Sequence, residues 1–418
     1  MIVKSYKYRL YPNKKQSKFL NQVFGDVRFV WNKLVENFNS YSTCGPNKPL
    51  NEKILKDTDE YSWLKDSISY ALQQKRMDFE EFKKQFFNKK RKKKLGKPQF
   101  KKKGITRDSF RIPGQQIGYN KAVDFENNTI KIPKMGKVKL VIDREFTGQL
   151  KSITVSKNKC DQYFVSILVE KEIDLKQNTG RSVGIDLGLN SLLTLNNGVK
   201  INNPRWFRDS QSKLKKAQQH LSRKEKGSNR YLKQKLKVAK IHLKTTNQRS
   251  FVLHNLSSWL VNEYDNIFME DLNVEGMKRG NLGKSVSDAS FSELTRQIEY
   301  KCTWYGKLFN KVNRFFPSSK LCSNCDYKND DLKRSDSHWE CPDCGIVHDR
   351  DINAAVNIYQ QGFLDVYGID IRSEELPDLD SNGILNRRGE AIRPLKCLHL
   401  SGIFDEAFNN FYNFYRKA

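Results

Sequence analysis

Alternating polar and apolar residues predict short strands along the first part of the chain, with two helical patterns between them. Val3 to Tyr11 alternates and stops at Pro12, which is typical of a strand. Apolar residues at helical spacing then predict helices over 16–38 and 67–92. Four more alternating segments follow, at 129–132, 138–142, 152–155 and 163–169. Regular Gly and Asn turns between them indicate a small antiparallel barrel, and the two helices are an insertion if the first strand joins it.

A different pattern begins after a linker at 177–181. An apolar strand over 182–186 ends in an acid, Asp186, and a hairpin returns through 191–195. A later apolar strand, which begins at residue 266, also ends in an acid, Glu270. The other elements predicted here are two long basic helices within 207–264, a helix over 291–310 and a strand at 314–316.

Four of the eight cysteines form two Cys-x-x-Cys pairs separated by fifteen residues. They are Cys322, Cys325, Cys341 and Cys344. Four thiolates at this spacing predict a tetrahedral structural zinc site. So short a segment buries little apolar surface, so the bound metal would also supply its folding free energy. His338 and His348 are expected at the surface or against nucleic acid, because four sulfurs already complete the coordination of the metal.

Asp349 and Asp351 come directly after this segment, where apolar residues at helical spacing begin. Either carboxylate could simply cap the helix. Asp186 and Glu270, however, also stand where a core element ends, although Asp186 alone could be a turn residue. Carboxylates gathered at a buried edge repel one another unless a cation neutralises them, and magnesium binds such groups. Asp186, Glu270 and Asp351 are therefore predicted to share a site.

The charge of the chain indicates a polyanionic partner. Lys and Arg number 76 against 47 acids, a net charge of +29, and aromatic residues are interleaved with the basic ones. The densest cluster is predicted to bind phosphates. It consists of Lys89, Lys90, Arg91, Lys92, Lys93, Lys94, Lys101, Lys102 and Lys103. No apolar stretch approaches a membrane span, and residues 1–10 lack a signal-peptide core, so a cytoplasmic protein without membrane contact is expected.

Several of these segments are similar to one known family. They are GIDLGLNSLLTL (184–195), FMEDLNVEGM (268–277), the two Cys-x-x-Cys pairs, DRDINAAVNI (349–358), KSYKYRLYPNKKQ (4–16), FGDVRFVWN (24–32) and KLGKPQFKKK (94–103). In this order and spacing they resemble the TnpB family, transposon-encoded RNA-guided DNA endonucleases with a RuvC-like nuclease. The resemblance implies that Asp186, Glu270 and Asp351 are the catalytic acids, with Asp349 as the alternative third acid. It also implies magnesium, or manganese, at these acids, and a guide RNA and single- or double-stranded target DNA as partners.

The fold implied is α/β plus β-barrel. An RNase H-like (RuvC) nuclease domain with an inserted zinc ribbon would follow a wedge-like β-barrel that carries a helical recognition insertion. The expected boundaries are 1–15 and 100–178 for the barrel, 16–99 for the insertion, 181–316 and 346–366 for the nuclease, 317–345 for the ribbon and 367–418 for a tail.

Three other functions remain open at this point. The chain could be a nuclease-inactive RNA-guided DNA-binding repressor, a transposase-type DNA strand transferase, or a zinc-ribbon RNA-binding protein with a vestigial core. The sequence leaves open whether the protein is a monomer or a dimer.

Overall fold

A computed structural model describes residues 1–372 except 45–49, 92–93, 174, 281 and 334, together with 384–385 and 391–392. The chain divides into two compact units, Met1–Ile173 and Asp174–Ala418. Lys92, Lys93 and most of the predicted tail lie outside the described residues. Within the described part, no helix has the length and apolar character needed to cross a bilayer.

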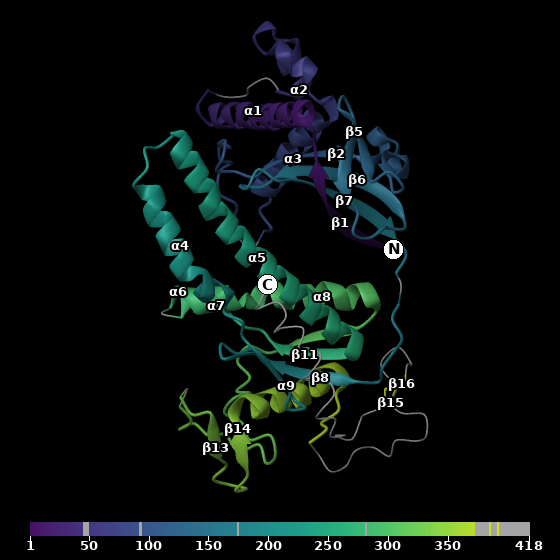
Figure 1. Ribbon diagram of the computed structural model, residues 1–418. Helices are drawn as coiled ribbons and strands as arrows, with labels where there is room; N and C mark the ends of the chain where they lie inside the picture. The colour runs from purple at the N-terminus through teal and green to yellow at the C-terminus, as the bar shows by residue number, and fades with distance from the viewer. Residues whose placement is uncertain are drawn as a thin grey trace. The chain divides into compact units, whose positions relative to one another are not determined.

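The first unit is built on a seven-stranded antiparallel sheet of order β2-β6-β7-β1-β5-β4-β3 (Figure 1). Its strands are β1 (Ile2–Tyr11), β2 (Asp108–Pro113), β3 (Val123–Asp124), β4 (Thr129–Ile132), β5 (Gly136–Val141), β6 (Gln149–Lys157) and β7 (Tyr163–Lys171). The first strand pairs with both β5 and β7, so the intervening helices are an insertion into the sheet, as predicted. The pairings among the described residues leave β2 and β3 at open edges, so a closed barrel is not confirmed.

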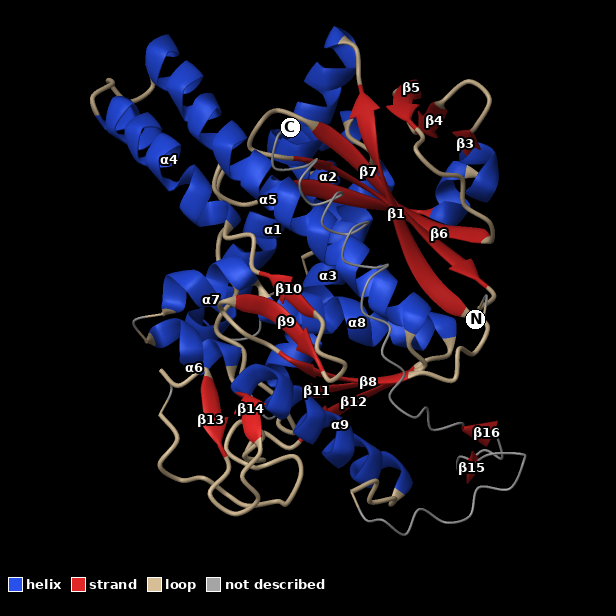
Figure 2. Cartoon of the chain, turned by 60° about the horizontal axis from the view of Figure 1, so that its bottom comes forward, coloured by secondary structure: helices blue, strands red, loops and turns tan. Residues whose placement is uncertain are grey.

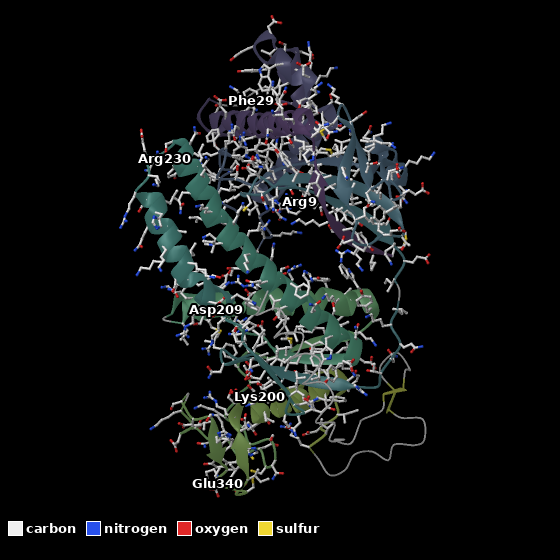
Figure 3. The ribbon with its side chains drawn as sticks, viewed as in Figure 1. Arg9, Phe29, Lys200, Asp209, Arg230 and Glu340 are labelled. Carbon is white, nitrogen blue, oxygen red and sulfur yellow. The ribbon has the colours of Figure 1, made fainter. Side chains whose placement is uncertain are left out.

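The helices of this unit pack on the sheet or on one another. They are α1 (Lys14–Cys44), α2 (Glu52–Asp57) and α3 (Ser69–Phe87), with short 3-10 turns at Asp59–Asp66, Gly114–Ile117 and Tyr119–Ala122. The buried residues of β1, Tyr6, Tyr8 and Leu10, alternate with polar ones and share a core with α1. Phe29 of α1, labelled in Figure 3, packs edge-on against Tyr61. The core therefore follows the alternation seen in the sequence.

The second unit contains a mixed five-stranded sheet of order β10-β9-β8-β11-β12 (Figure 2). Its strands are β8 (Ser182–Asp186), β9 (Ser191–Leu195), β10 (Lys200–Asn202), β11 (Asn266–Glu270) and β12 (Leu308–Val312). β8, β11 and β12 are parallel neighbours, whereas β9 and β10 run antiparallel. Long crossover segments between β8, β11 and β12 carry the helices, as parallel pairing requires.

The helices of this unit lie on both faces of the sheet. They are α4 (Trp206–Ser222), α5 (Asn229–Glu263), α6 (Val274–Arg279), α7 (Gly283–Ala289), α8 (Phe291–Tyr305) and α9 (Arg350–Tyr367). Ile267 and Met269 of β11 share a core with α5 and α8, whereas Phe268 between them packs with α9. Successive residues of a strand point to opposite faces, so α8 and α9 cover opposite sides of the sheet (Figure 1).

The edge strand β12 differs from the sequence prediction. A helix over 291–310 and a strand at 314–316 were expected, but the helix ends at Tyr305 and the strand is Leu308–Val312. Gly306 explains the difference, because it adopts the left-handed conformation (φ 70°) that ends helices and that glycine accepts at low cost. Residues 314–316 instead form a turn after β12.

Two small strand pairs complete the described structure. β13 (His338–Glu340) and β14 (Val347–Asp349) form an antiparallel pair in the cysteine-rich segment. β15 (Ile384–Leu385) and β16 (Ala391–Ile392) form another. The first pair leads directly into α9, because Asp349 is both the last residue of β14 and the N-cap of the helix.

Candidate active site and metal centre

Asp186 and Glu270 lie at the carboxyl ends of adjacent parallel strands and on the same face of the sheet. In the register of β8 and β11, Gly184 is opposite Phe268 and Ile185 is opposite Met269. Asp186 comes two residues after Gly184, and Glu270 comes two residues after Phe268. Because side chains along a strand alternate between the two faces, these four residues share one face of the sheet. This is the face that α9 covers. Both carboxylates therefore point toward the side of the sheet on which Asp351 begins its helix.

Glycine at two contacts lets α9 approach the sheet closely. A Cβ built on Gly184 would lie 2.3 Å from the carbonyl oxygen of Ala355 and 2.5 Å from the backbone nitrogen of Tyr359. A Cβ built on Gly362 would lie 2.3 Å from the Phe268 ring. These two contacts fix where α9 lies on β8 and β11. Asp351 is one helical turn before Ala355, so the same contacts place it near the end of the sheet at which Asp186 and Glu270 lie. We call this end of the sheet the acidic edge.

The charges of Glu270 and Asp351 act on the carboxyl group of Asp186. Burial raises the pKa of Asp186 well above its usual value, and the charges of Glu270 and Asp351 raise it further. Burial also raises the pKa of Glu270, although a hydrogen bond from Ser318 opposes this change. The ionised forms are thus disfavoured here, and a bound cation would relieve that cost. The carboxylate oxygens fit the ligand preference of magnesium.

Asp349 caps helix α9, which is one of the two roles that the sequence left open for it. Its side chain accepts hydrogen bonds from the backbone nitrogens of Asp351 and Ile352, both at 3.1 Å, so it is the N-cap of α9. It also accepts a hydrogen bond from Lys200 of β10 at 2.7 Å. Its oxygens are therefore already engaged, which favours Asp351 as the third acid.

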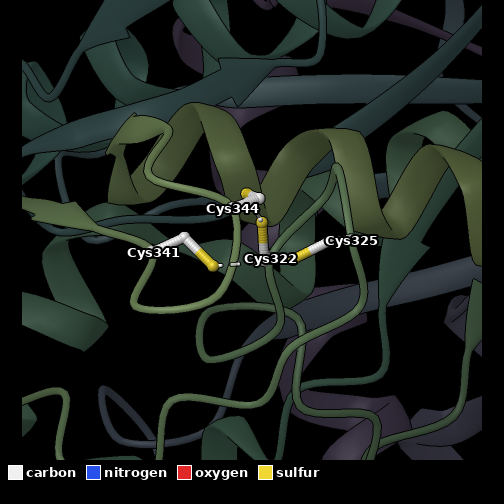
Figure 4. Close-up of side chains that lie close together, drawn as sticks. All are labelled: Cys322, Cys325, Cys341 and Cys344. Carbon is white, nitrogen blue, oxygen red and sulfur yellow. Dashed lines mark hydrogen bonds between the residues drawn. The ribbon is translucent and has the colours of Figure 1, made fainter.

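The four cysteines of the ribbon meet at one point. Their sulfur atoms all lie within 4.8 Å of one another (Figure 4). The Cys325–Cys341 and Cys322–Cys344 pairs are 3.5 and 3.7 Å apart. Four sulfurs placed about 2.3 Å from a zinc ion have tetrahedral edges of about 3.8 Å, so the cluster fits zinc. Among the described residues the three carboxylates do not form a group as compact as this one.

The two cysteine pairs have the same backbone geometry. Cys322 donates its N–H to the carbonyl of Tyr327, and Cys341 donates to that of Ile346, both at 2.9 Å. The residue after each second cysteine has a positive φ, 61° at Asp326 and 71° at Gly345. The backbone N–H of Ile346 beside Cys344 lowers the pKa of that thiol to about 7, although partial burial opposes it. Burial and the neighbouring thiols raise the pKa of Cys322 and Cys325, so Cys344 ionises before these two thiols, and the thiolate is the form that binds metal.

The expectation for His348 was wrong. This residue is buried, and its ring stacks on Trp339 with the centroids 4.9 Å apart. Its Nε2 atom is 3.1 Å from the Cys322 sulfur. Register explains the burial, because His348 is paired with Trp339 across β13 and β14 and shares its inward face. His338, by contrast, is exposed.

The described residues of the basic cluster belong to an irregular segment of the first unit. All are exposed except Lys101, whose ammonium lies 3.9 Å from the centre of the Trp31 ring. Burial, together with the nearby Lys75, lowers the pKa of Lys101 to about 8. Asn32 of α1 holds the backbone of Lys101 through two hydrogen bonds, of 2.7 and 3.0 Å. The exposed lysines around it are thus displayed on an anchored loop.

Sequence reasoning missed several polar residues that hold the site together. Ser318 donates its hydroxyl to a carboxylate oxygen of Glu270. Asn353 and Asn357 of α9 are buried and bind the backbone that leads into the first cysteine pair. Two amides spaced by four residues on the apolar face of a predicted helix were a signal that could have identified the pair. Nothing in the sequence around Ser318 marked its contact with Glu270.

Comparison with protein families matches three parts of the chain. Residues 165–281 match a family described as "Probable transposase", 291–358 match "Cas12f1-like, TNB domain", and 1–43 match "Helix-turn-helix domain". In this chain, the last of these ranges contains β1 and most of the single helix α1.

Relatives with similar sequences extend over most of the chain. A Streptomyces pristinaespiralis protein named "Putative RNA-guided DNA endonuclease" is 35% identical, covering 86% of this chain and 90% of that protein. "Putative RNA-guided DNA endonuclease InsQ" of Escherichia coli K12 is 31% identical and covers 86% and 92%. Among solved structures, the Cas12f1–sgRNA–target DNA complex aligns with a TM-score of 0.52 at 18% identity, over 83% of each chain. The last comparison indicates a similar fold.

Proposed function

The chain belongs to the TnpB family, and we propose that it is an RNA-guided DNA endonuclease that cleaves complementary target DNA beside a short flanking motif. The observation that carries the nuclease assignment is the gathering of Asp186, Glu270 and Asp351 at one edge of a mixed sheet. In the proposed assignment, this sheet and its helices are the RuvC-like domain. Transposon maintenance is the setting that the family suggests.

Asp186, Glu270 and Asp351 would hold magnesium or manganese, which when bound supplies charge neutralisation and an activated water for phosphodiester cleavage. Within the chain, the half-buried Asp186 provides a carboxylate that gains from a cation, because its charge is otherwise poorly solvated. The hydrogen bond from Ser318 restricts the carboxylate of Glu270. The Asp349 cap and its contact with Lys200 keep the start of α9, and with it Asp351, in place.

The rest of the chain would bind and orient nucleic acid. The exposed members of the basic cluster suit phosphate contacts, and α4 and α5 form a lysine-rich hairpin, with Arg230 near the start of α5 (Figure 3). A guide RNA would read the target by base pairing, while the protein holds the backbones. The four thiols would bind zinc as a structural ion.

Cleavage of a plasmid library tests the proposal. Each plasmid carries a target matched to the guide next to randomised bases, and the protein is expressed together with the DNA that encodes its guide. Magnesium-dependent cuts next to one motif, lost in Asp186→Ala, are expected. Target binding without cuts in the unaltered protein would instead show a guided repressor, and joined DNA ends would show a strand transferase.

A further inference from the structure

Two buried asparagines occupy one face of α9, the helix that begins at the acidic edge. Asn353 is 2% exposed and Asn357 is 1% exposed. A buried amide destabilises a fold unless its polar atoms are hydrogen-bonded. The Nδ2 atom of Asn357 donates to the carbonyls of Ser318 (2.8 Å) and Leu321 (2.7 Å), and that of Asn353 donates to Leu321 (2.7 Å). Both amides therefore hold the same short segment.

The first residue of that segment reaches the acidic edge. Ser318 is 3% exposed, and its hydroxyl donates to Oε1 of Glu270 on β11. Its carbonyl is the group that Asn357 binds. A continuous path of hydrogen bonds thus runs from the helix that carries Asp351, through Asn357 and Ser318, to the carboxylate of Glu270.

The other end of the segment is the first cysteine pair. Leu321 and Ser323 flank Cys322, whose sulfur belongs to the four-thiol cluster. The backbone nitrogen of Ser323 donates to Oδ1 of Asn353 at 2.9 Å. The two asparagines thereby fix the cysteine pair and the serine against one helix.

We propose that Ser318, Asn353 and Asn357 are positioning residues that set the Glu270 carboxylate relative to Asp351 and tie it to the cysteine ribbon. This inference rests on the proposed function, in which Glu270 binds a divalent cation. A glutamate has several rotamers, and fixing one of them in advance lowers the entropy lost when a metal binds. Hydrogen-bond partners of metal ligands typically change metal affinity or activity by about 10–100-fold when they are removed.

We call the hydrogen-bonded path from α9 through Ser318 to Glu270 the relay. Ser318→Ala tests it, because this substitution removes only the hydroxyl oxygen that binds Glu270. The first measurement is the affinity of the protein without nucleic acid for Mn²⁺, followed by electron paramagnetic resonance, with Asp186→Ala as the blank. The second is the Mg²⁺ concentration that gives half-maximal cleavage. We expect Mn²⁺ affinity to fall by about 10–100-fold and the half-maximal Mg²⁺ concentration to rise in proportion. Zinc content and target binding should not change.

Conservative and matched variants separate positioning from a general loss of structure. Ser318→Thr keeps the hydroxyl and should restore Mn²⁺ affinity. Asn357→Leu keeps a similar side-chain volume and adds no charge but lacks the amide donor, so it should act in the same direction as Ser318→Ala. Gln361→Ala is the control, because this glutamine is on the same helix and its amide donates to Asp365.

Two results would overturn the relay. One is that Ser318→Ala binds Mn²⁺ as tightly as the unaltered protein does, and the other is that the unaltered protein binds Mn²⁺ no better than Asp186→Ala. The proposed function fails separately, when the unaltered protein binds Mn²⁺ at this site but cuts no matched target. In that case the Mn²⁺ affinities still decide whether Ser318 positions Glu270.

Discussion

Replacing Gly184 with alanine should displace α9 from the sheet. The new Cβ would lie 2.3 Å from the Ala355 oxygen, 2.5 Å from the Tyr359 nitrogen and 2.6 Å from the Tyr359 Cβ. All three atoms belong to the backbone of α9 or are fixed to it, so no side chain can rotate away. Ordinary contact begins at 3.4 Å, which is 1.1 Å beyond the shortest of these distances. We therefore expect the helix to move by about 1 Å, with an overpacking cost of about 1–3 kcal/mol.

Two measurements check this prediction. The thermal midpoint of the second unit should fall by about 2–12 °C, given its size. Because the start of α9 carries Asp351, the single-turnover cleavage rate of the assembled guide complex should fall by about 100-fold, as for other displacements of about 1 Å. Target binding, measured without divalent metal, should remain near that of the unaltered protein.

Gly280→Ala is the matched control. Its Cβ would meet only the Met277 oxygen, at 3.8 Å, and its φ is negative. This variant should melt and cleave like the unaltered protein. If Gly184→Ala also did so, the close approach of β8 and α9 would not be what places Asp351, and the account of the site would be wrong.

Three further changes test separate parts of the structure. Because the pKa of Asp186 is raised, the folded protein keeps a proton that the unfolded chain releases. Without divalent metal, the stability of the protein should therefore fall as pH rises through that pKa. The melting point should fall less steeply with pH in Asp186→Asn than in the unaltered protein, and equal slopes would contradict this account. Cys341→Ser removes one of the four thiols, so zinc content by mass spectrometry should fall from about one per chain toward zero, and retained zinc would argue against the site. Asp349→Ala should cost about 0.5–2 kcal/mol in urea unfolding, whereas Asp349→Asn should cost less, and equal losses would rule out capping as the cause.

The sequence predicted where β8 and β11 end because local patterns determine the ends of strands. An apolar run that stops at an acid locates Asp186 and Glu270 without any knowledge of packing. The four thiols are similarly marked by their spacing. Pairing of β1 with the later strands was also predictable, since its alternation matched theirs.

Other features depend on contacts between distant segments, so no local pattern shows them. Gly184 resembles any glycine in a strand until α9 is placed against it. The burial of His348 follows from its register with Trp339, which the sequence does not fix. The first sheet has open edges because β2 and β3 do not pair with each other. Alternation predicts the strands but not which strands pair. The strand β12 was missed for a local reason, because Gly306 was not recognised as the end of α8.

The continuity of β14 and α9 bears on how the protein matures during synthesis. Asp186 and Glu270 leave the ribosome before the ribbon, whereas Asp351 follows it. The 80 residues between Glu270 and Asp351 take about 4–16 s to translate at about 5–20 residues per second. During this interval the nascent chain has two of the three acids but not the helix that supplies the last. If the ribbon binds zinc as proposed, zinc capture would be a late step in biogenesis, and a cell short of zinc would accumulate chains whose ribbon, the segment that leads into α9, has not folded.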